Sequence, residues 1–359
     1  GSPNMRQRWL PTLIGVAALA CVVALRIADP IPVTQVRNWV FDGYQRLEPR
    51  PYEPAGVRVI DIDETSLEAY GQWPWPRTVL ATLVERLDKL GAAAIVFDMV
   101  FAEPDRTAPD NLLTAWQGHG LTETVRKSLR ALPDPDQVLA QAIKNAPTVT
   151  GFVPRTADQQ TGTTLSARPP ARPAGFAFSG DDPAPLLPRF SGATTNLTPL
   201  DEAAKGNGSF GLVPDADNVV RQIPLAHSID GTVYPSLAAE ALRVAQGAGT
   251  HIIKTSSGSG ESYFGGELGV TAMKIGRVVV PTTAEGRVHL YDTGPVAERS
   301  IPAARVLGGL LDQSLRQKVE GHIVLIGTSA PGLRDIRATP LNPAAAGVTV
   351  QAQALEQMI

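Results

Sequence analysis

Apolar residues follow three patterns along this chain, and the first is a continuous run near the N-terminus. Between residues 9 and 28 only Thr12 and Arg26 are polar, and the run is close to the ~20 residues that a helix needs to cross a bilayer core. Two arginines precede it, and short basic flanks stay on the cytoplasmic side of a membrane. The pattern therefore predicts a transmembrane anchor at residues 5–28, with the N-terminus in the cytoplasm and the following chain outside it.

Two other interpretations of this run stay open. A cleaved signal peptide has the same basic start, but its apolar region is only ~7–15 residues long. Residues 18–21 resemble a lipoprotein cleavage box, although Ala18 stands where leucine is expected. The length of the run favours the uncleaved anchor. Residues 1–4, which precede Met5, are interpreted as a cloning remnant.

The second pattern is a helical repeat of apolar residues just after this run. Seven apolar residues between positions 33 and 47 recur at largely helical spacing, and prolines bound the stretch on both sides. We expect an amphipathic helix that packs on the main domain or mediates dimerisation. Residues 29–56 are thus predicted to be a membrane-proximal helix and a linker.

The third pattern alternates strands with helices. Residues 57–63 form a β-branched run typical of a strand, residues 78–90 carry apolar positions at helical spacing, and residues 92–101 form a second apolar strand. Such a strand, helix and buried strand make a βαβ unit, whose strands are parallel. The chain is therefore predicted to be an α/β protein with a mixed, largely parallel sheet flanked by helices.

The remaining chain continues this alternation with one interruption. Residues 154–199 are rich in Pro, Thr, Ala and Gly and show little periodicity, so we expect an irregular insertion loop there. The other predicted elements are a mainly helical stretch at 107–146, strands at 148–153, 219–225 and 322–329, and helices at 235–246 and 348–359. All of them belong to one domain, residues 57–359.

Composition narrows the functional classes. The formal charge is −3 and no cluster of Lys and Arg is found, which argues against a nucleic-acid partner. The single cysteine, Cys21, allows no disulfide within the chain. The five histidines are scattered without a HExxH pair, and neither a Walker loop nor a Gly-x-Ser-x-Gly motif is found. We expect no cofactor, no dedicated zinc site and no catalytic residue.

Acidic residues at predicted strand ends are the most suggestive candidates for a site. Asp61 and Asp63 lie two residues apart and so share one face of their strand, and Asp98 lies near the end of a neighbouring strand. In open α/β sheets, ligands bind beyond the carboxyl ends of the strands. We therefore expect a ligand-binding crevice formed by Asp61, Asp63, Asp98, Thr328, Ser329 and Asp335.

Two other interpretations of these carboxylates remain. Oxygen ligands of this kind hold Mg²⁺ or Ca²⁺, so Asp61, Asp63 and Asp98 are the residues that a metal-dependent hydrolase would use. The structural alternative, which we favour, is that Asp61 and Asp63 cap the following turn and pair with Arg77 or Arg334.

A rigid aromatic turn contributes further candidates. Trp73 and Trp75 alternate with prolines just before Arg77, at the start of a predicted helix. Indole rings can form a platform for a ligand, and an arginine beside them can bind an anion. Alternatively, the two indoles fill the core and Arg77 neutralises an aspartate.

Motifs in a fixed order connect residues 57–359 to one family. The first group is VIDIDETSL (59–67), GQWPWPR (71–77) and FDMVF (97–101), and the second is GSFG (208–211) and DADNVVR (215–221). The last group is IVLIGTSA (323–330), GLRD (332–335) and GVTVQAQ (347–353). The series closely resembles the type 2 CHASE domain, an extracellular sensory module.

The resemblance implies that the chain is the sensor of a bacterial transmembrane signalling receptor and is not itself an enzyme. It further implies that the receptor lies in the inner (cell) membrane and that the sensor domain lies in the periplasm or outside the cell. It implies as partners an unidentified small molecule or periplasmic protein, the membrane, and a second copy in a homodimer with the helix around Trp39 near the contact. The implied output is a cytoplasmic nucleotide cyclase, with a histidine kinase, diguanylate cyclase or Ser/Thr kinase as alternatives. A purely structural dimerisation module is a further hypothesis.

Two features depart from the pattern of the family. Gln351 and Gln353 stand where the family commonly has histidine and asparagine, and residues 154–199 carry no motif of the family. The first departure argues against a role of these two positions in binding a metal or a proton.

Overall fold

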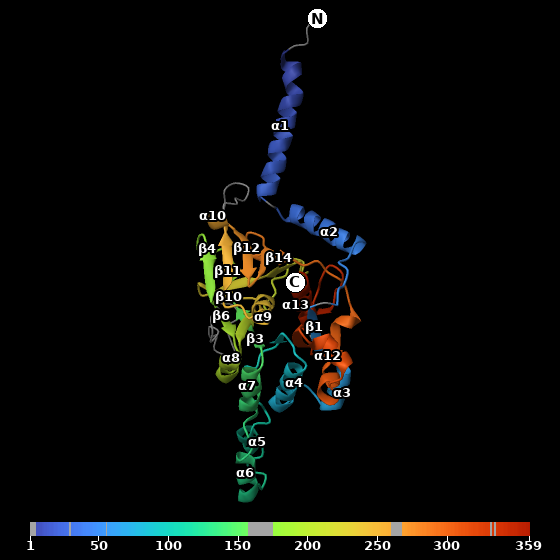
Figure 1. Ribbon diagram of the computed structural model, residues 1–359. Coiled ribbons are helices and arrows are strands. Elements are labelled where there is room, and N and C mark those ends of the chain that lie inside the picture. The colour runs from blue at the N-terminus through green and yellow to red at the C-terminus, as the bar shows by residue number, and fades with distance from the viewer. Residues whose placement is uncertain are drawn as a thin grey trace. The chain divides into compact units, whose positions relative to one another are not determined.

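The chain divides into two compact units, Gly1–Arg50 and Pro51–Ile359 (Figure 1). The computed structural model describes residues 5–28, 30–54, 56–156, 175–259, 268–330, 332, 333 and 335–359, without the side chains of residues 5–8, 26, 27 and 259. The segment interpreted as a cloning remnant, residues 1–4, and Arg334, one expected partner of the aspartates, lie outside the described residues.

The first unit consists of two helices, α1 (Met5–Ala28) and α2 (Ile31–Leu47). Proline occupies the first turn of α2, a position where its missing amide hydrogen is not needed. A helix therefore forms over the predicted residues 33–47. Its large apolar side chains are mostly exposed, namely those of Ile31, Val36, Trp39, Val40, Tyr44 and Leu47.

The transmembrane anchor predicted for residues 5–28 is not supported. No helix in the described part of the chain is long and apolar enough to cross a membrane. A helix does form over this stretch, and it contains Pro11.

The second unit is built around a sheet in which every neighbouring pair but one is parallel. Its strands occur in the order β15 (Ser300–Pro302), β1 (Val57–Ile62), β16 (Ile323–Thr328), β2 (Ala94–Phe97), β3 (Thr148–Arg155) and β6 (Gly192–Thr194), with β7 (Gly206–Ser209) also paired to β3. Only β6 runs antiparallel to its neighbour. The predicted α/β fold with a mixed, largely parallel sheet is confirmed.

Helices cover both faces of this sheet. Ile60 and Ile62 of β1 pack with α4 (Arg77–Lys89), α7 (Pro135–Asn145), α11 (Ala303–Gly308) and α12 (Gln313–Val319) in one apolar core. Val57 and Val59 of the same strand pack in a second core with α9 (Leu237–Ala245) and α13 (Gly347–Glu356). Because side chains alternate along a strand, the three central strands β1, β16 and β2 each contribute to both cores.

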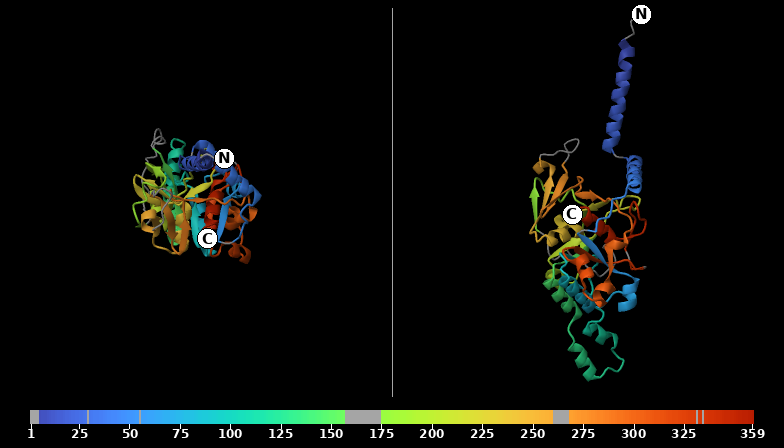
Figure 2. Two further views of the ribbon diagram at one scale, coloured as in Figure 1. Left: turned by 90° about the horizontal axis from the view of Figure 1, so that it is seen from above. Right: turned by 45° about the vertical axis from the view of Figure 1, so that its right-hand side comes forward.

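Short sheets and helices complete the second unit. The small sheets are β13 (Val278–Pro281), β12 (Val270–Ile275), β11 (His251–Thr255) and β4 (Phe176–Ser179); β10 (Thr232–Pro235), β9 (Ala226–Ile229) and β5 (Arg189–Phe190); β14 (Arg287–His289) with β8 (Gln222–Pro224); and β17 (Ile336–Arg337) with β18 (Ala345–Ala346). The remaining helices are α3 (Glu64–Tyr70), α5 (Pro109–Ala115), α6 (Glu123–Arg130), α8 (Thr198–Ala203) and α10 (Ser256–Ser259). Helices α5 and α6 form a hairpin that extends away from α7 (Figures 1 and 2).

The segment 154–199, expected to be an irregular loop, is partly regular. Its described residues contain β4, β5, β6 and the start of α8. Each of these three strands pairs with a strand that is not its neighbour in sequence: β4 with β11, β5 with β9, and β6 with β3. The hydrogen-bond partners come from the tertiary structure, so the local composition of the segment did not reveal them. Residues 157–174 of the expected loop lie outside the described residues.

Candidate functional site

Two of the predicted aspartates lie at the carboxyl ends of neighbouring parallel strands. Asp61 is in register with Gly327 of β16, and the Asp98 amide donates to the Ile326 carbonyl of the same strand. Asp61 and Asp98 therefore flank β16, about 10 Å apart, which is two strand spacings. By the alternation of side chains, both belong to the face of the sheet that α13 covers.

The first turn of α13 lies directly on β16 between these two aspartates. A Cβ atom built at Gly327 would lie 2.5 Å from the Val348 Cβ, which is too short for two carbons that are not bonded. Only glycine at this position of β16 allows the helix to approach so closely. A ligand bound at the carboxyl ends of these strands would therefore contact the start of α13.

Asp61 is bound to the turn that follows β16. Its carboxylate accepts hydrogen bonds from the Ser329 amide, at 3.0 Å, and from the Ser329 hydroxyl, at 2.5 Å. Burial raises the pKa of Asp61, the Ser329 hydroxyl opposes this effect, and the nearby Asp63 raises the pKa further. The prediction that Asp61 and Ser329 come together is confirmed.

Asp98 is half-buried, and its carboxyl group has no hydrogen bond or ion pair to the described residues. Desolvation is the main cause that raises the pKa of Asp98 to about 7; the charge of Asp335 raises it further, and that of Arg337 lowers it. Asp98 can therefore gain or lose a proton near neutral pH, unlike an ordinary aspartate.

Asp335 connects Asp98 to the start of α13. Its Oδ2 accepts from the Arg337 side chain at 2.6 Å, and its backbone carbonyl accepts from the Gly347 amide at 2.8 Å. A Cβ built at Gly347 would lie 3.3 Å from Asp335 Oδ2, which places the carboxylate against the first residue of the helix. We call Asp61, Asp98, Ser329 and Asp335 the carboxyl-edge cluster.

Two other predicted residues are used locally. The Thr328 hydroxyl donates to the Leu333 carbonyl at 3.1 Å and so closes the turn after β16. Asp63 caps α3: it accepts from the Ser66 amide and hydroxyl, at 2.9 and 2.6 Å, and from Thr65. Partial burial raises the pKa of Asp63, but the hydrogen bonds from Ser66 and Thr65 outweigh it and hold the pKa below its ordinary value. The capping role that we favoured for Asp63 is confirmed.

The aromatic turn belongs to the opposite core. Trp75 is 1% exposed and donates from its indole to the Gly71 carbonyl at 2.8 Å, and Trp73 packs against its edge. Arg77 forms an ion pair with Asp136 at 3.3 Å and lies over the Phe101 ring. These three candidates therefore fill and neutralise the core around α4, and the structure does not bring them to the carboxyl-edge cluster.

The proposed metal ligands are not brought together either. Among the described residues no group of three His, Cys, Asp or Glu side chains could hold a metal ion. Asp63 is turned into the cap of α3, Asp61 is bound to Ser329, and Asp98 lies on the far side of β16 from Asp61. The geometry thus counts against the metal-dependent hydrolase.

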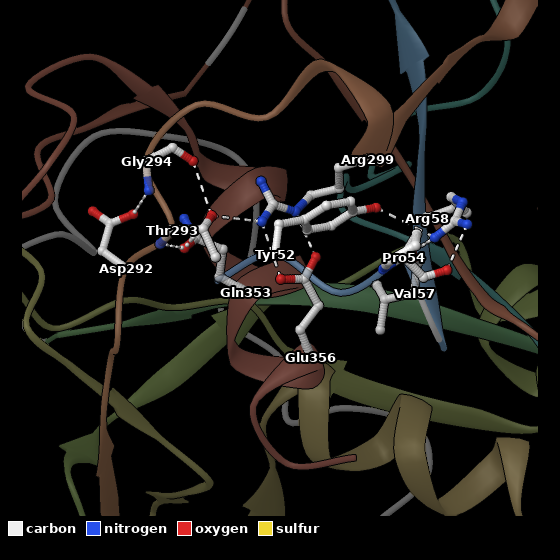
Figure 3. A network of polar contacts seen from close by, with 10 residues as sticks. All are labelled: Tyr52, Pro54, Val57, Arg58, Asp292, Thr293, Gly294, Arg299, Gln353 and Glu356. Atoms are coloured by element: carbon white, nitrogen blue, oxygen red, sulfur yellow. Dashed lines mark hydrogen bonds and ion pairs between the residues drawn. The ribbon is translucent and has the colours of Figure 1, made fainter. Parts of the chain in front are cut away.

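A second polar cluster, around Arg299, was not predicted from the sequence (Figure 3). Arg299 is fully buried and donates twice to the Glu356 carboxylate of α13, at 2.5 and 3.0 Å, and once to the Thr293 hydroxyl, at 2.7 Å. Its guanidinium lies 5.1 Å from the centre of the Tyr52 ring. The partners are 57 positions apart in the chain, so no local pattern could have indicated this ion pair.

The side chains of Gln351 and Gln353 attach α13 to its surroundings. Gln353 accepts from the Thr293 amide and hydroxyl, at 2.7 and 3.2 Å. Gln351 is 2% exposed and donates to the Phe210 carbonyl at 3.5 Å. Both side chains connect α13 to the loops that surround it.

Comparison with known proteins gives one match. The family model of the CHASE2 domain matches residues 16–359, nearly the whole chain. No curated protein and no solved structure matches. The resemblance inferred from the strand-end and aromatic motifs is therefore confirmed: the chain belongs to the CHASE2 domain family, a family of extracellular, non-catalytic sensory domains.

Proposed function

We propose that this CHASE2 domain lies outside the cytoplasm in a bacterial transmembrane signalling receptor, and that the carboxyl-edge cluster binds the signal, a polar small molecule or a periplasmic protein. Asp98 carries the proposal. Its carboxyl group lies at the end of a parallel strand, where ligands of open α/β sheets bind, and no described residue pairs with it. A perturbed carboxyl group at such a position favours a functional role.

The proposed output is a cytoplasmic nucleotide cyclase, with a histidine kinase, diguanylate cyclase or Ser/Thr kinase as alternatives. The membership of the chain in a sensory family supports an output of this kind. A signal can change the output only if it binds one arrangement of the receptor more tightly than another. The proposal therefore requires that an occupied and an empty carboxyl-edge cluster favour different arrangements of the second unit.

The receptor is further proposed to act as a homodimer with α2 near the contact. The exposed apolar side chains of this helix support the proposal: Trp39 is 73% exposed and Val36 62%. Sedimentation of the wild-type chain and of W39E would test it. The substitution is expected to shift the chain toward the monomer, and an unchanged sedimentation coefficient would place the contact elsewhere.

A thermal-shift screen tests the sensing site. Polar metabolites and periplasmic extracts are added to the wild-type chain, to D98N, and to D88N, a control that exchanges an exposed carboxylate on α4 for an amide. A true signal is expected to raise the midpoint of unfolding of the wild type and of D88N by several degrees, and that of D98N by much less. Equal stabilisation of all three proteins would exclude the carboxyl-edge cluster as the binding site.

A further inference from the structure

Helix α13 connects two polar clusters that lie at its opposite ends. Its first residue, Gly347, donates to the Asp335 carbonyl, and its second, Val348, rests on Gly327 between Asp61 and Asp98. Its last residue, Glu356, is the carboxylate that neutralises Arg299. With a rise of 1.5 Å per residue, the helix spans about 15 Å between these two clusters.

The cluster at the far end is buried. Arg299 and Glu356 have side chains only 1% and 3% exposed. Since a buried charge that loses its partner is strongly destabilising, a displacement of Glu356 must carry Arg299 with it. Thr293 strengthens this connection because it accepts from Arg299 and also donates to Gln353 of α13. The end of the helix, Arg299 and the loop at Thr293 therefore form one rigid group.

Tyr52 extends this group to the segment that enters the sheet (Figure 3). The guanidinium of Arg299 lies over the Tyr52 ring, and the Tyr52 hydroxyl accepts from Arg58 at 3.4 Å. Arg58, the second residue of β1, also donates to the Val57 carbonyl at 2.8 Å and to the Pro54 carbonyl at 2.7 Å. Arg58 thus holds Tyr52, Pro54 and Val57 together near the start of the second unit, and the Tyr52 ring places them against the same group.

We infer that α13 relays a change at the carboxyl-edge cluster to residues 52–58 through the Arg299–Glu356 ion pair and the Tyr52 ring. The inference rests on the proposed sensory function and names its internal route. Tyr52 is the second residue of the second unit, which begins at Pro51 directly after the last residue of the first unit, Arg50. A shift of α13 therefore acts at the point where the second unit is joined to α1 and α2.

Hydrogen exchange followed by mass spectrometry tests the relay without any ligand. D98N keeps position 98 neutral at pH 8, where the wild-type carboxyl group is ionised, so the comparison of the two proteins at this pH isolates a change of charge at this one residue of the cluster. We expect exchange to differ about threefold or more both at residues 335–337, beside Asp98, and in the segment 52–60. The same comparison is then made in an E356Q background, where the difference at 335–337 is expected to persist and that at 52–60 to disappear.

A matched control is D312N. Asp312 forms an exposed ion pair with Arg305 at 2.5 Å, and asparagine preserves its cap on α12. In this background the difference at 52–60 is expected to remain. If E356Q does not fold, the apolar pair R299M/E356L replaces it, because a buried ion pair is often exchanged for apolar residues without loss of stability.

Three results would overturn the relay. A difference at 52–60 that persists in E356Q would exclude the ion pair as the route. A difference confined to residues 335–337 would exclude any relay while leaving the proposed sensing site intact. The absence of a difference at both segments would refute the role of Asp98 and, with it, the proposed site as well as the relay.

Discussion

Replacing Asp98 with asparagine is expected to make the chain more stable at alkaline pH and to leave its stability unchanged in acid. The pKa of Asp98 is raised from 3.8 to about 7, chiefly because the folded chain desolvates the carboxyl group. Between these two pH values the folded state binds a proton that the unfolded state has released. The free energy of unfolding therefore falls as pH rises, and the contribution of the neutral carboxyl group, complete below pH 3.8, is lost by about pH 7.

The magnitude follows from the same shift. A tenfold change in proton affinity corresponds to about 1.36 kcal/mol, so the full shift is equivalent to ~4 kcal/mol. Asp98 keeps part of its surface in solvent, which screens its charge. We therefore expect D98N to exceed the wild type at pH 8 by about 2–4 kcal/mol in free energy of unfolding. At pH 4 the two proteins should agree.

Urea unfolding between pH 4 and pH 8 measures this difference, with tryptophan fluorescence as the signal because Trp75 lies in the core. Other carboxyl groups with raised pKa values, such as Asp61, titrate in both proteins and cancel when one curve is subtracted from the other. D88N serves as the control and should give a difference that is flat with pH. A D98N curve parallel to the wild-type curve, or one that falls below it at pH 8, would refute the assignment of a desolvated, proton-binding Asp98.

Three further substitutions test the local contacts. S329A removes the hydroxyl that donates to Asp61; it should raise the pKa of Asp61, as read by NMR titration, and cost about 1–2 kcal/mol in urea unfolding. D63A should cost about 1 kcal/mol by uncapping α3, and D63N should restore most of it; equal losses in both variants would contradict the cap. E240A removes the buried carboxylate that binds Arg243 at 2.6 Å and should cost about 3–5 kcal/mol; a loss below 1 kcal/mol would show that the charge is not buried.

Local patterns were sufficient for most elements that pack within one segment of chain. The β-branched run predicted at residues 57–63 became β1, the apolar repeat at 78–90 became α4, and the apolar strand at 92–101 became β2, which lies beside β16 as β1 does. These predictions succeed because alternation and helical spacing record which side chains face the core. They fail for β4, β5 and β6, whose burial depends on strands elsewhere in the chain.

The residues of the candidate site were likewise predicted only in part. The sequence placed Asp61, Asp98 and Ser329 at strand ends, and the parallel sheet brought them to one edge, because carboxyl ends of parallel strands share an edge. It did not distinguish Asp63, which turned away to cap α3, from its neighbour two residues earlier. Asp61 still belongs to strand β1, whereas Asp63, two residues later, already caps the next helix.

By itself the sequence determined the family, the α/β class and the acidic strand ends, because motifs and periodicity depend only on residues that are close together in the chain. Only the tertiary structure decided that Trp75 and Arg77 serve the opposite core, and that α13 lies on β16 between Asp61 and Asp98. It alone also joined Arg299 to Glu356. These contacts join residues that are far apart in the chain. They are stabilised by burial, and burial exists only once the chain is folded.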